Sequence, residues 1–155
     1  MVRMRTLAFL LVALIIGAGS AMADVVYDAE ITGMYVVPPS ECDGYGQATM
    51  IVNTERTQAY LTLNFAGLDT PQTRAVLLAG AADEAGTVLM ELPMGSPLAL
   101  TVEYTTELAE AVENEMLAVQ IASESCPDGA IRGNFVFVTV GTEAQSWTQV
   151  KTLFE

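Results

Sequence analysis

Two cysteines are the residues of this sequence best suited to a defined chemistry. Cys42 and Cys126 are the only cysteines of the 155-residue chain, and they do not form a CxxC pair, which excludes thiol–disulfide oxidoreductase chemistry. We predict a disulfide between them, which closes a loop of about 84 residues and contributes about 4–5 kcal/mol in the chain-entropy model. Gly44 and Pro127 supply turn chemistry beside the two cysteines, so the bridge should tie two loops together at one end of the fold. Free thiols and an intermolecular bridge are the alternatives.

The absence of histidine removes a second set of chemistries. Without an imidazole there is no His–Ser or His–Cys catalytic pair and no His-ligated zinc or copper. The 19 Asp and Glu residues would allow glycosidase-type carboxylate pairs, but no feature of the sequence selects one. We therefore predict no catalytic residue, no cofactor and no enzymatic activity.

Calcium binding by the acidic residues is the alternative function. The candidate ligands lie in turns and loops, but no D-x-D-x-D-G loop is present, so no metal-binding residue is predicted. These candidates are Asp43, Asp83, Glu84 and Asp128.

The charge balance excludes other partners. Six Lys and Arg against 19 Asp and Glu give a net charge of −13, which disfavours contact with nucleic acids and with anionic membranes. The partner we expect is an unidentified protein or a component of the envelope or matrix. The sequence does not specify an oligomeric state.

The first 23 residues have the organisation of a secretory signal peptide. Arg3 and Arg5 precede an apolar run over residues 7–18, and Ala21 and Ala23 give the small-x-small cleavage pattern. The run is too short for a comfortable bilayer span, so we expect no membrane span once it is removed. An uncleaved N-terminal anchor is the alternative. The exported chain should therefore be periplasmic or extracellular, where disulfides persist.

The elements that position the remaining residues read as short strands separated by turns. In residues 58–65, Ala59, Leu61 and Leu63 alternate with Tyr60 and other polar residues, which predicts one buried and one wetter face. Residues 105–114 instead predict a short helix capped by a Thr. We predict an all-β fold over residues 24–140, a single Greek-key sandwich or barrel of about seven to nine strands with one short helix. Residues 141–155 should form a C-terminal tail or an extra strand.

The segment PDGAIRGNF at residues 127–135 resembles the closing pattern P-x-G-E-I-R-G-Q of the CHRD domain, a module of chordin and of many bacterial secreted proteins. The segments AEITG (29–33), VVPP (36–39), GQA (46–48) and YLTLNFAGL (60–68) resemble earlier parts of that family, in the right order. The resemblance implies a secreted, non-catalytic β-domain that acts in binding, adhesion, or envelope or matrix structure. The matching residues of the closing pattern, which we expect to be structural, are Pro127, Gly129, Ile131, Arg132 and Gly133.

Besides Ala130 and Asn134, which stand for Glu and Gln in the closing pattern, three histidine positions of the family are occupied by other residues. The family's A-H-I-H segment reads AVLL here, and its N-V-H-T segment reads QIAS, so Val76, Leu78 and Ala122 stand where the family has histidine. Val, Leu and Ala offer neither a lone pair nor a proton, so any metal or proton chemistry of those histidines is lost. If the family's histidines serve packing and hydrogen bonding instead, the three substitutions only make the surroundings of these positions less polar and less hydrated.

Arg132 is the one base between Arg74 and Lys151. Because it lies in a strand-like run, its guanidinium needs partners, and we predict an ion pair or a carbonyl clamp near the Cys126 loop. An anion-binding arginine is the alternative. Gly129 and Gly133 should serve a turn and close strand packing.

Overall fold

The computed structural model describes residues 23–138. The predicted signal peptide and the C-terminal tail at 141–155 lie outside the described residues, and the predicted domain at 24–140 falls almost entirely within them. Within this part of the chain, no helix is long and apolar enough to cross a bilayer.

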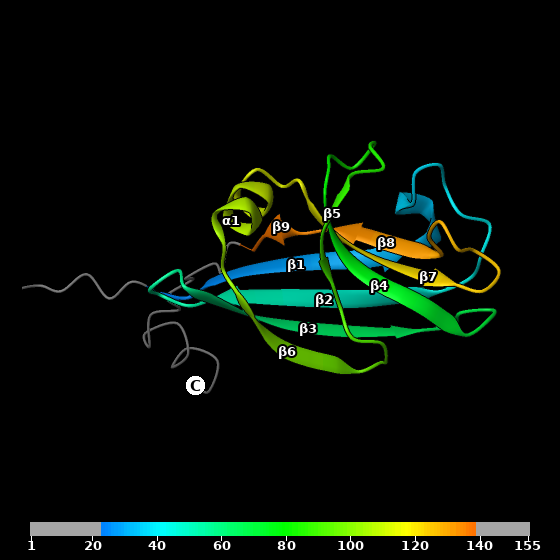
Figure 1. Cartoon of the computed structure of the whole chain (residues 1–155), viewed down its shortest axis with the longest axis horizontal. Coiled ribbons are helices and arrows are strands. Elements are labelled where there is room, and N and C mark those ends of the chain that lie inside the picture. The colour runs from blue at the N-terminus through cyan, green and yellow to red at the C-terminus, as the bar shows by residue number, and fades with distance from the viewer. Residues whose placement is uncertain (1–22, 139–155) are drawn as a thin grey trace, which may run out of the picture.

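The described residues form one antiparallel sheet of nine strands (Figure 1). The strands are β1 (Val25–Thr32), β2 (Tyr45–Val52), β3 (Gln58–Ala66), β4 (Gln72–Ala79), β5 (Thr87–Glu91), β6 (Leu98–Glu103), β7 (Leu117–Ser123), β8 (Ile131–Asn134) and β9 (Val136–Phe137). Their order is β5-β4-β7-β8-β1-β2-β3-β6, and β9 pairs with β1. The sheet curls into a half-barrel, so the predicted all-β fold with one short helix is confirmed, in its barrel-like form.

Strand alternation determines which side chains face the core. Ala48 pairs with Leu63 and Met50 with Leu61 across β2 and β3, and all four side chains are buried. Their neighbours along each strand point outward, away from the concave side of the sheet. The alternation predicted for residues 58–65 is therefore confirmed.

Two halves of the sheet meet where β1 lies beside β8. Only Thr32 and Arg132 are register partners there, and the backbones approach so closely that a Cβ on Gly133 would lie 2.1 Å from the carbonyl oxygen of Glu30. Glycine at this position allows the two halves to join and curl around a shared core. The close strand packing expected of Gly133 is thus present in the structure.

The sequence of residues 130–140 predicts one long strand, which is wrong in its extent, because the structure divides the described part of it into β8 and β9. β8 lies between β7 and β1, and β9 pairs with β1. At Phe135, between the two strands, the ring is fully buried and the N–H still donates to the Leu117 carbonyl of β7 at 2.8 Å. Pairing with β7 ends there, and sequence alternation alone did not indicate the break.

Helix α1 (Thr106–Glu113) connects the two halves and confirms the predicted helix. The Thr105 side chain accepts a hydrogen bond from the Leu108 N–H, as an N-cap does. Leu108 and Val112 are buried against the core, and the glutamates of the helix face solvent. A further short element, the 3₁₀ turn η1 (Gly33–Tyr35), follows β1.

Candidate functional site

The predicted disulfide is present and joins two loops at one end of the half-barrel. Cys42 and Cys126 are bonded with a Cα–Cα distance of 6.4 Å, within the usual range for disulfides. Ser40 Oγ donates to the Cys126 sulfur at 3.4 Å, and Ser125 Oγ lies 3.3 Å from the Cys42 sulfur. Both alternatives, free thiols and an intermolecular bridge, are excluded by this pairing. A disulfide is consistent with an oxidising, exported location.

Arg132 is fully buried, and its guanidinium clamps a loop. It donates to the carbonyls of Glu84 at 2.5 Å, Ala81 at 3.0 Å and Ala85 at 3.4 Å. Of the two arrangements predicted, an ion pair or a carbonyl clamp, the structure contains the clamp. The clamped loop is residues 80–86, between β4 and β5, and not the Cys126 loop, so the predicted location is wrong. The strand order explains the error, because it brings the hairpin loop of β4 and β5 over the outward side of β8.

The environment of Arg132 leaves no role for it as an exposed anion site. Burial lowers the pKa of the Arg132 guanidinium, yet Arg side chains remain protonated at ordinary pH. A cation in this position is stabilised by the dipoles of the surrounding carbonyls. Asn134, next in the outward row of β8, extends the arrangement by donating to the carbonyls of Gly80 and Glu115. Two neighbouring side chains thus fasten the loop to the sheet.

The other residues of the closing motif lie in a turn and in the core. The Gly129 N–H donates to the Cys126 carbonyl at 3.2 Å, closing a turn with Pro127 at its second position. Gly129 has φ +138°, a backbone conformation that favours glycine, and the Gln120 side chain packs directly beside it. Ile131 is fully buried.

The structure gathers the three positions where the family has histidine on one surface. Val76 and Leu78 point outward from β4. Ala122 points outward from the adjacent β7, where its register partner is Arg74 of β4. Val76 and Leu78 are nevertheless buried and form a small apolar cluster with Ala118. Imidazoles at these positions would therefore share one region. Here the three side chains are apolar, and a hollow of about 140 Å³ beside Val76 and Ala122 is also lined by Arg74, Gln120 and Asp128.

The acidic residues do not gather into a ligand set. Within residues 23–138, no group of three or more His, Cys, Asp or Glu side chains is placed to hold a metal ion. Asp43 lies near Asp69, whose carboxylate accepts a hydrogen bond from the Asp43 N–H at 3.0 Å. Asp83 and Glu84 are exposed on the clamped loop, and Asp128 is exposed beside the disulfide.

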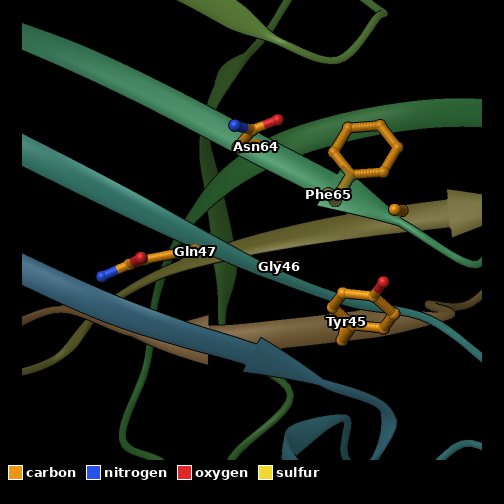
Figure 2. Close-up of a pocket in the computed structure, with 6 residues that line it drawn as sticks. Tyr45, Gly46, Gln47, Asn64 and Phe65 are labelled. Atoms are coloured by element: carbon orange, nitrogen blue, oxygen red, sulfur yellow. The ribbon is translucent and has the colours of Figure 1, made fainter.

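A second surface, which the sequence analysis did not single out, lies on the outward side of β2 and β3. A hollow of about 430 Å³ is lined by Tyr45, Gly46, Gln47, Asn64, Phe65 and Ala66. Figure 2 shows the Tyr45 ring at one end of the hollow, with the Gln47 and Asn64 amides further along the two strands. Phe65 shares the inward parity of Leu63, and its side chain packs against the core. A second hollow of about 250 Å³ shares Gln47 and Asn64 and continues over Thr49, Thr62 and Ala99. We call the two together the β2–β3 groove.

Local contacts hold the wall of the groove in place. Ser96, in the loop before β6, accepts a hydrogen bond from the Phe65 N–H and donates to the Phe65 carbonyl, both at 2.8 Å. Gly67 has φ +75°, and a Cβ there would lie 3.3 Å from the Tyr45 ring. Glycine therefore allows both the turn after β3 and the position of the ring.

The residues that line the groove are uncharged, although the neighbouring strand β1 places the carboxylates of Asp28 and Glu30 opposite Thr49 and Gln47. Among the outward side chains of β2, β3 and β6, only Glu103, at the end of β6, is ionisable as an acid or base near neutral pH. The others are Tyr45, Gln47, Thr49, Ile51, Gln58, Tyr60, Thr62, Asn64, Ala66, Ala99 and Thr101. The signal available in the sequence was the run of uncharged polar residues on the wetter face of residues 58–65.

Comparison with known proteins is consistent with this architecture. The family model of the CHRD domain matches residues 27–135, from β1 to the end of the closing motif. No curated protein and no solved structure matches the chain. Because the match covers well over half of the sequence, the chain belongs to the CHRD domain family.

Proposed function

We propose that this protein is a secreted, non-catalytic CHRD module that binds a component of the envelope or the extracellular matrix through the β2–β3 groove. The observation that carries the proposal is the groove itself, an uncharged, solvent-open surface with an exposed aromatic ring and two amides. Tyr45 is 66% exposed, although it is one of the larger side chains of the sheet. Exposed aromatic residues beside polar groups are typical of binding surfaces.

The positions that the sequence singled out for chemistry are less suited to recognition. The site of the family's histidines is apolar and largely covered, and Arg132 is engaged by backbone carbonyls. The other two arginines of residues 23–138 form ion pairs, Arg56 with Glu113 and Arg74 with Glu91. A rigid sheet held by a disulfide suits a module that presents a surface, and the predicted export places it where envelope and matrix partners occur.

Adsorption to native material tests this proposal. Purified exported chain, wild type or Tyr45→Ala, is mixed with envelope and insoluble culture-medium fractions of the producing cells, and the bound share is measured. We expect wild type to adsorb and Tyr45→Ala to bind at least about tenfold more weakly, because exposed aromatic anchors carry much of an interface's energy. Tyr35→Ala is the matched control, since Tyr35 is 45% exposed on η1, outside the groove.

Equal adsorption of wild type and Tyr45→Ala would contradict the proposal that the groove is the binding surface. The adsorbed material should also be recovered chemically unchanged after prolonged incubation. Its cleavage or modification by wild type would contradict the non-catalytic assignment.

A further inference from the structure

We propose that the ligand of the β2–β3 groove is a neutral glycan chain. This inference rests on the proposed function and names the chemical class of its ligand. It follows from what the groove offers, what it lacks and how far it extends.

The two amides at the centre of the groove offer hydrogen bonds to a ligand. Gln47 and Asn64 are register partners on β2 and β3, and both side chains are exposed. Asn64 Oδ1 lies 3.3 Å from Ser96 Oγ, which shares its single proton with the closer Phe65 carbonyl, and the exposed Asn64 amide keeps its N–H donors available to a ligand. Within residues 23–138, the Gln47 amide makes no hydrogen bond. Paired amides supply both donors and acceptors, as vicinal hydroxyl groups require.

The aromatic end of the groove offers an apolar platform. The Tyr45 ring lies over Gly67, beside the turn that follows β3. A pyranose ring presents C–H groups on its faces and hydroxyl groups around its edge. An amphipathic tyrosine can cover such a face while the neighbouring amides bind the hydroxyls.

The lining argues against anionic and against purely apolar ligands. No Lys or Arg lines either hollow, and the neighbouring charges on β1, Asp28 and Glu30, are negative, so an anionic group would lose hydration without gaining a counter-charge. A purely apolar ligand would instead cover the Gln47 and Asn64 amides and leave them unpaired, which costs about 1–3 kcal/mol for each group. A neutral polyhydroxylated ligand avoids both penalties.

The length of the groove favours a chain over a single sugar. From Tyr45 to Thr49 the strand advances by about 13 Å. Thr49 and Thr62 provide further hydroxyls along this path. The small side chain of Ala99 leaves the far side of the groove open. Thr49 Oγ1 already donates to Asp28 at 2.6 Å, so its oxygen is oriented as an acceptor.

Calorimetric titration of the exported chain with defined oligosaccharides tests the inference. The neutral probes are cellohexaose, xylohexaose, mannohexaose and chitohexaose, and the anionic probes are hexagalacturonate and a heparin hexasaccharide. We expect at least one neutral probe to bind in the micromolar to millimolar range and neither anionic probe to bind. Tyr45→Ala and Asn64→Ala should each weaken binding about tenfold or more, whereas Tyr35→Ala should leave it unchanged.

Two results would overturn the inference. One is the absence of binding by every neutral probe at millimolar concentration, and the other is binding that Tyr45→Ala and Asn64→Ala leave intact. Thermal unfolding of each variant, expected to match wild type because both side chains are exposed, separates loss of contact from loss of fold. If envelope adsorption depends on Tyr45 but no neutral glycan binds, the glycan inference fails and the proposed function stands.

Discussion

Arg132 illustrates how a residue that suggests ligand chemistry can serve the fold instead. Its side chain is a cation in an acidic protein, but the structure surrounds it with the carbonyls of loop 80–86. The sequence predicted the need for partners from strand-like burial of a charge. It did not predict which loop supplies them, because that depends on the order of strands in the sheet. Tyr45, by contrast, carries no motif, and its importance follows from its exposure and its neighbours.

Replacing Arg132 with Met should strongly destabilise the protein. Three carbonyls would lose their charged donor, and buried unpaired polar groups cost about 1–3 kcal/mol each, so we expect a loss of at least about 3 kcal/mol. Urea unfolding measures the change. Arg74→Met is the matched control, because Arg74 is an exposed arginine that pairs with Glu91 on the surface, and it should alter stability little. Equal effects of the two substitutions would contradict the clamp.

Tyr104 should ionise later than an ordinary tyrosine. Burial, with the nearby Tyr27 and Glu113, raises the pKa of Tyr104 from 10.0 to about 12. Since the folded state holds this proton more tightly than the unfolded state, the stability contributed is complete below pH 10 and is lost as the pH rises toward 12. Ultraviolet titration of tyrosinate should show a late component that Tyr104→Phe removes. A late component that persists in this variant would assign it to another tyrosine.

At the scale of elements, the sequence predicted what each segment is better than which segments are neighbours. Alternation correctly predicted the strands around residues 58–65, and capping chemistry predicted the helix that begins after Thr105. Alternation did not predict the break at Phe135, where the ring is buried, one last hydrogen bond reaches Leu117 of β7, and only the pairing with β1 continues into β9. The β2–β3 groove was missed for the same reason. It exists because Gln47 and Asn64 meet across two strands, and register is a property of the pair.

The junction of β1 and β8 gives a prediction about these elements. Gly133→Ala would place a methyl group 2.1 Å from the Glu30 carbonyl oxygen, so the two strands must separate. We expect a loss of about 3 kcal/mol or more, since overpacking of a tight junction costs this much when backbone must move. Chemical denaturation of the variant measures it. Wild-type stability would show that the halves of the sheet do not meet as closely as described.

At the scale of the whole molecule, the described residues form one curled sheet with a single disulfide at one end. The absence of enzymatic activity expected from the composition stays a prediction, whereas the turn chemistry around Cys42 and Cys126 correctly predicted a bridge at one end. The strand order then separates the two outward surfaces. One carries the apolar positions where the family has histidine, and the other carries the uncharged groove.

The disulfide should account for a large part of the stability. A chain with Cys42→Ser and Cys126→Ser loses the constraint on a loop of 84 residues, for which the chain-entropy model gives about 4–5 kcal/mol. Guanidinium unfolding of the variant should show a decrease of this order, and reduction of wild type should reproduce it. If neither treatment alters the unfolding midpoint, the bridge is dispensable for the fold.

The most direct test of a binding function for the groove is an NMR titration of the isotope-labelled exported chain with solubilised envelope or matrix material. Backbone amide shifts report every described residue at once, so the experiment locates the contact without assuming it. We predict that the largest shift changes cluster at Tyr45, Gln47, Asn64 and Phe65. Changes centred instead on Val76, Leu78 and Ala122, with the groove unaffected, would contradict the account.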